Sequence, residues 1–121
     1  MLEEFAQQLV QRLNVTSGIS VVLVNDAAMK EYNLYFRGKN RTTDVLSFPY
    51  EREQWERGEA YLGDVVISVE QAYRQKKGSL LDELKVLTVH GVLHLLGYDH
   101  ETDSGEMEQL EKALKREFRL T

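Results

Sequence analysis

The chain has 121 residues, of which 42% are hydrophobic and 29% charged, and its formal net charge is −5. These values predict a single globular domain, residues 1–121, that buries about two-thirds of its unfolded surface. The absence of cysteine excludes disulfides and thiolate metal ligands. No leader or long apolar run is visible, so we expect a cytoplasmic protein without a membrane span. The negative charge means that any RNA contact needs a local basic cluster.

The first part of the chain predicts a helix, a strand and a second helix. Apolar residues spaced three and four apart predict an amphipathic helix over residues 2–13. The β-branched run Ile19–Val24 is typical of a buried strand. Asn25–Asp26 would cap a helix over about residues 27–36, which Gly38 would end. Its aromatic side chains are interpreted as packing residues rather than base-stacking platforms: Tyr32, Tyr35 and Phe36.

The middle of the chain predicts two further strands. Thr43–Phe48 would be a strand that Pro49 ends, because proline lacks the amide hydrogen that a central strand needs. Residues 51–59 are polar and would form a loop or a short hairpin. Tyr61–Ser68 would be the third strand, since it contains a continuous apolar stretch. A helix over about residues 69–77 would follow it.

The next predicted helix is the most apolar part of the sequence. Ser79 would cap it, and it would run to Leu96 as a buried central helix. Gly91 lies in its middle at a cost of about 1 kcal/mol relative to alanine, which indicates close approach of another element or space beside a bound group. A last helix would span about residues 104–118, with Met107 in the core. We therefore expect an α/β or α+β fold, with a small mixed sheet of three to four strands and about five helices.

All the histidines of the chain lie close together, at His90, His94 and His100. Residues four apart lie on one face of a helix, and Gly97 would end that helix so that His100 returns to the same face. Neutral imidazoles bind Zn²⁺, Ni, Cu or Fe(II), and three protein ligands leave a position open for water, as in catalytic zinc sites. The pattern predicts a metal site on the central helix. A structural metal, or histidines that merely pack, would also be consistent with it.

The histidine spacing equals that of the metzincin proteases, with one difference. Gly91 stands where those enzymes carry the glutamate that acts as general base. Glycine cannot transfer a proton, so peptide hydrolysis by that route is disfavoured. Asp99 could orient a ligand or act as a weak base, but an aspartate at this position is more typical of a turn.

Three segments of the chain together resemble a known family: His90–His100, Thr43–Pro49 and Leu62–Ser68. They are similar to the YbeY family of bacterial metalloendoribonucleases, and the resemblance covers nearly the whole chain. It implies a four-stranded sheet surrounded by helices. It also implies one Zn²⁺ per chain, bound by His90, His94 and His100.

The same resemblance implies the activity and the partners. These are cleavage of single-stranded RNA, maturation of the 3′ end of the small-subunit 16S rRNA, and ribosome quality control. The partners would be rRNA and the ribosome or its small subunit. An arginine important in the family matches Arg37.

Arg37 is the predicted catalytic residue, because a guanidinium group can offer paired donors to two phosphate oxygens. As a cation beside Gly38 at a helix end it would also fit a structural role. Two basic stretches could contact RNA, residues 37–41 and residues 74–77. Ser47 could touch the substrate backbone.

Some alternatives stay open at this stage. Metal-bound hydroxide and the 2′-hydroxyl of the RNA are equally good candidates for the nucleophile. The residues also allow a zinc-dependent hydrolase of another substrate, or a ribosome-assembly factor with a structural metal.

Overall fold

The computed structural model describes residues 2–50, 61–99 and 101–120. In that part of the chain the helices and strands are, in order, α1 (Leu2–Arg12), β1 (Gly18–Val24), α2 (Asp26–Arg37), β2 (Val45–Pro49), β3 (Tyr61–Ser68), α3 (Val69–Gln75), α4 (Leu80–Leu95) and α5 (Glu106–Glu117). The expected α+β fold is confirmed. The loop or hairpin expected at residues 51–59, and any fourth strand within it, lies outside the described residues.

The sheet is mixed and has β3 at its centre. Its order in the described chain is β1-β3-β2, with β1 parallel and β2 antiparallel to β3. Val65 and Ile67 of β3 are fully buried. In contrast, Val22 and Leu23 of β1 are 37% and 47% exposed. The prediction of a buried strand at β1 was therefore wrong. The β-branched run forms an edge strand, and within the described chain it pairs only with β3.

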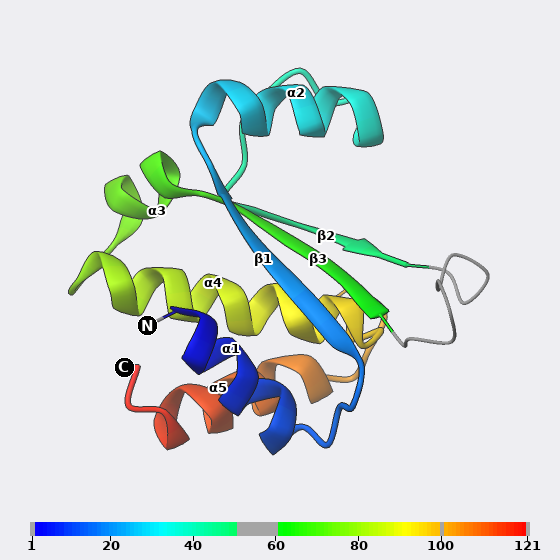
Figure 1. Cartoon of the computed structure of the whole chain (residues 1–121), viewed down its shortest axis with the longest axis vertical. Helices are drawn as coiled ribbons and strands as arrows, with labels where there is room; N and C mark the ends of the chain where they lie inside the picture. Colours follow the sequence, from blue (N-terminus) through cyan, green and yellow to red (C-terminus); the bar gives the residue numbers. More distant parts are fainter. Residues whose placement is uncertain (1, 51–60, 100, 121) are drawn as a thin grey trace.

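Helices cover both faces of the sheet, but unequally. Figure 1 shows α1, α4 and α5 on one face and α2 on the other. The larger core cluster lies on the first face and includes Phe5, Leu93, Met107 and Leu114, which confirms Met107 as a core residue. The smaller cluster, under α2, centres on Met29, Leu46 and Val66. Among the described residues, no helix has both the length and the apolar composition needed to span a membrane.

The aromatic residues of α2 only partly follow the packing interpretation. Tyr32 and Phe36 lie near Phe48 of β2, with ring centroids 6.0 and 4.9 Å away. Tyr35, however, is 83% exposed and Phe36 is 57% exposed. The interpretation was wrong for Tyr35, because only the helix face that carries Met29 is buried against the sheet.

Helix α4 is the buried central helix that the sequence predicts. Ser79 caps its start by accepting a hydrogen bond from the amide of Asp82, at 3.0 Å. A Cβ at Gly91 would lie 2.5 Å from Cγ1 of Val65, so glycine at this position allows the helix to approach the sheet closely. Gly97, at φ 96°, ends the helix in the left-handed region as expected.

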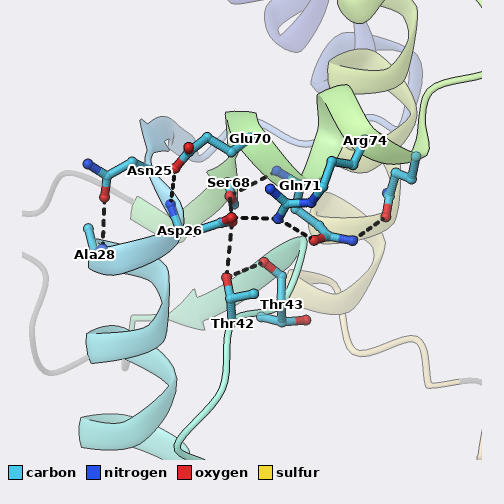
Figure 2. Close-up of polar contacts among 10 residues, drawn as sticks. Asn25, Asp26, Ala28, Thr42, Thr43, Ser68, Glu70, Gln71 and Arg74 are labelled. Atoms are coloured by element: carbon cyan, nitrogen blue, oxygen red, sulfur yellow. Dashed lines mark hydrogen bonds and ion pairs between the residues drawn. The ribbon is translucent and has the colours of Figure 1, made fainter.

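Four polar residues connect α2 to neighbouring elements through hydrogen bonds (Figure 2). We call these residues the Asp26 cluster: Asp26, Thr42, Ser68 and Arg74. One carboxylate oxygen of Asp26 accepts hydrogen bonds from the hydroxyls of Ser68, at 2.7 Å, and Thr42, at 3.3 Å. The other accepts from Nη2 of Arg74 at 2.5 Å. The hydrogen bond from Ser68, followed by that from Arg74, holds the pKa of Asp26 below its usual value of 3.8. The cluster thereby joins α2, the segment before β2, the end of β3 and α3.

Candidate active site

Two of the predicted metal ligands converge on the last two turns of α4. The Nε2 atoms of His90 and His94 are 3.0 Å apart, and their ring centroids are 4.5 Å apart. This is the length of a hydrogen bond between the rings. It is also close to the roughly 3.3 Å that separates two nitrogens bound tetrahedrally to one zinc ion. The two imidazoles therefore fit a shared metal ion.

His100 lies outside the described residues, so the third predicted ligand remains a prediction. Within residues 2–50, 61–99 and 101–120, no three histidine, aspartate or glutamate side chains are arranged to hold a metal ion. The predicted site therefore depends on His100 to complete the set with His90 and His94.

Glu111 of α5 orients His90, and the sequence analysis did not find it. Its Oε1 lies 2.7 Å from Nδ1 of His90, and its side chain is only 13% exposed. Metal-binding histidines usually donate their second ring N–H to such a carboxylate, which fixes the tautomer and leaves the other nitrogen free to bind. One signal was available. Glu111 follows the fully buried Met107 by four residues, so the two share the buried face of α5.

A cleft of about 400 Å³ opens in front of the two histidines; we call it the histidine cleft. Its other walls are formed by Arg37 and by residues of β2 and the segment before it. Arg37 is exposed at the end of α2, and it makes no side-chain hydrogen bond or ion pair with any residue that the structure describes. The structure therefore brings the predicted catalytic arginine and two predicted ligands to one cavity, although they are more than 50 residues apart in sequence.

Ser47 and Asp99, two other candidates, both make hydrogen bonds within the protein. Ser47 lines the histidine cleft, but its hydroxyl donates to the carbonyl oxygen of Gly91 at 2.8 Å and so joins β2 to α4. The carboxylate of Asp99 accepts a hydrogen bond from the amide of Glu101 at 2.9 Å, as expected of a turn residue. Asp99 also borders a second hollow beside the cleft, together with Arg37 and His94.

The two basic stretches differ in their relation to the cleft. Arg37 belongs to its wall, whereas none of residues 74–77 lines it. Arg74 is instead paired with Asp26.

A larger hollow, of about 770 Å³, lies between α3, α4 and the end of the chain, but no histidine lines it. The residues that line a hollow therefore indicate the candidate site better than the volume of the hollow does.

Comparisons with known proteins identify the family to which the chain belongs. A family model described as Endoribonuclease YbeY matches residues 1–119. Curated relatives named Endoribonuclease YbeY are 44% identical in Nautilia profundicola, over 84% of this chain and 73% of the relative, and 41% identical in a Sulfurovum species, over 98% and 81%. The solution structure of the Thermotoga maritima protein TM1509 has a TM-score of 0.61 at 31% identity, and the match covers 98% of this chain and 81% of that one.

The fold and the cleft thus define a small α+β protein with a histidine pair on its central helix. The chain belongs to the YbeY endoribonuclease family, as its motifs predict.

Proposed function

We propose that this chain is an endoribonuclease that cleaves phosphodiester bonds of single-stranded rRNA during rRNA maturation. Membership of a family described as Endoribonuclease YbeY supports RNA cleavage. The observation that carries the proposal is the histidine cleft, where two converging imidazoles and an arginine without a described partner line one cavity. The substrate would be the 3′ region of small-subunit rRNA, with the ribosome as a partner and the cytoplasm as the site of action.

The proposal includes one Zn²⁺ held by His90, His94 and His100. The spacing of the two described Nε2 atoms and the carboxylate of Glu111 behind His90 support it. When bound, zinc supplies a Lewis acid and lowers the pKa of a bound water. The protein's part is to hold the ligand geometry, which the packed surroundings of α4 favour.

Arg37 would neutralise the phosphate that is being cleaved. A guanidinium group can donate to two phosphate oxygens at once, and the negative charge on them grows as the bond breaks. Because Arg37 has no described partner, no ion pair with a described residue must break before it binds phosphate. Glu111 would keep the proton of His90 on Nδ1, so that Nε2 is the ring nitrogen that would bind the metal.

The direct test compares cleavage of a labelled single-stranded RNA with that of its duplex. We expect cleavage of the single strand, loss of cleavage with chelator, and recovery on adding Zn²⁺. Metal analysis should find about one zinc per chain in the wild type and less in His90→Ala. Zinc binding without cleavage of any RNA would favour an assembly factor with a structural metal. Cleavage that is insensitive to chelator would exclude the zinc mechanism.

A further inference from the structure

A narrow groove extends the histidine cleft on the side away from the histidines. It has a volume of about 210 Å³. It shares Arg37, Thr43 and Leu46 with the cleft, so the two hollows adjoin. The residues that line only the groove are Asn33, Lys39, Arg41 and Thr42. A strand lying in the cleft can therefore continue into a groove that contains two more cations.

The loop that carries these cations is held by a buried side chain. Asn33 is 3% exposed, and its amide nitrogen donates to the carbonyl oxygen of Arg41 at 2.9 Å. The amide of Lys39 donates to the carbonyl oxygen of Asn33 at 3.2 Å, and the amide of Arg41 to that of Lys39 at 2.9 Å. The hydroxyl of Thr42 donates a hydrogen bond to Oδ1 of Asp26 at 3.3 Å. The backbone is thus fixed on both sides of the two basic residues.

The side chains of Lys39 and Arg41 are nevertheless available. Both residues are exposed, and neither makes a side-chain hydrogen bond or ion pair with the described part of the chain. The hollow beside His94 also includes Arg37, and two acidic residues, Asp99 and Glu101, belong to its lining. Lys39 and Arg41 thus add positive charge beside one part of the cleft, and Asp99 and Glu101 add negative charge beside His94, within a chain of net charge −5.

We propose that Lys39 and Arg41 form a phosphate-binding subsite, which holds the backbone of single-stranded RNA on one side of the scissile phosphate. The inference rests on the proposed function, because it extends the same cleft. Fixed cations in a groove suit the regular spacing of backbone phosphates, and such contacts need no particular base sequence. Asp99 and Glu101 offer no comparable attraction for phosphate, so we expect the RNA to be held more strongly on the side of Lys39 and Arg41.

The test measures binding of a labelled single-stranded RNA of about ten nucleotides, a length typical of such sites. The subsite variant combines Lys39→Gln with Arg41→Gln. The control combines Lys112→Gln with Arg116→Gln, which removes the same charge from exposed positions of α5, outside the cleft and its groove. Affinity is measured by fluorescence anisotropy at several salt concentrations. Gels confirm that the strand stays intact, and thermal melting confirms that the variants fold.

We expect the subsite variant to bind roughly tenfold more weakly, and the slope of log K against log salt to shrink by about 1.4, since each single-strand phosphate contact contributes about 0.7. The control should bind like the wild type. An equal loss of RNA affinity in both variants would mean that only the overall charge of the protein matters. Binding by the subsite variant as tight as that of the wild type would contradict the proposed subsite.

Cleavage by the wild type is scored separately in the same samples. If the wild type binds through these residues but cuts no RNA, the proposed activity fails while the subsite stands. If the wild type cuts RNA but the subsite variant binds normally, only the subsite fails.

Discussion

The histidine cleft and the Asp26 cluster are both polar, and both contain an arginine, yet the two arginines are satisfied to different degrees. In the Asp26 cluster, Arg74 is paired with Asp26, and Ser68 is fully buried and donates to the same carboxylate. In the histidine cleft, Arg37 has no partner in the described chain, and His90 and His94 face a cavity. The first cluster connects elements of the fold, whereas the second lines an open cavity.

The comparison shows that the residue types of a cluster do not decide its role. An arginine whose donors are taken up by a carboxylate contributes to stability. An arginine whose donors remain available beside a cavity contributes little to folding but can bind an anion without first losing an interaction. Substitutions should therefore separate the two regions, with effects on activity in one and on stability in the other.

The largest effect should follow His94→Ala, which removes one of the two converging imidazoles. We expect cleavage to fall by about 10³-fold or more, because the metal and its electrostatic contribution would be lost together. Single-turnover RNA cleavage measures the loss, and chelator-treated wild type is the control. Residual activity well above that of the chelated wild type would contradict a role for His94 as a metal ligand.

Arg37→Gln should reduce cleavage by about 10²-fold to 10³-fold, the usual effect of removing one donor from a developing anion. Its free energy of unfolding should change by no more than about 0.5 kcal/mol, since the side chain is exposed and makes no hydrogen bond or ion pair with a described residue. Arg74→Gln is the matched control, and it should show the reverse: near-normal cleavage and a lower Tm. Normal cleavage by the Arg37 variant would remove Arg37 from the mechanism.

Glu111→Gln should have an intermediate effect, because it acts through His90. We expect the affinity for zinc to fall by about 10-fold to 100-fold, as is typical when the carboxylate behind a ligand histidine is lost. Competition with a chelator of known affinity measures this change. Added zinc should restore cleavage to Glu111→Gln but not to His94→Ala; failure of zinc to restore it would indicate that Glu111 acts in another way.

Asp26→Asn should have the smallest effect on cleavage and should mainly lower Tm. The pKa of Asp26 is lowered in the fold, so its contribution to stability is complete above the unfolded value of 3.8 and is lost as the pH falls through the folded-state pKa. The difference in Tm between wild type and variant should be constant above about pH 4 and should shrink below it. Thermal melts over this range test it, and a difference independent of pH would exclude the charge of Asp26 as the cause.

Local signals in the sequence predicted much of the fold. Ser79, Asn25, Gly38 and Gly97 mark helix ends through contacts within a few residues, and each was placed correctly. The pairing of His90 and His94 also depends only on the helical repeat.

What the sequence did not predict depends on tertiary structure. Glu111 is 21 residues from His90, and the Asp26 cluster joins residues 16 to 48 positions apart. The edge position of β1 and the exposure of Tyr35 follow from which surfaces remain uncovered once the elements have packed. Apart from the position of Glu111 on the buried face of α5, no pattern within a single helix or strand indicates these features.

The contact between Gly91 and Val65 limits how this fold can change. A single codon change could place glutamate at Gly91, next to the first histidine, where metzincins carry their general base. Here even a methyl group would lie 2.5 Å from Cγ1 of Val65, so the new side chain would force α4 away from β3 and disturb the histidines it carries. Directed evolution of this chain towards a peptidase of that kind would therefore need coordinated changes in the helix and the sheet.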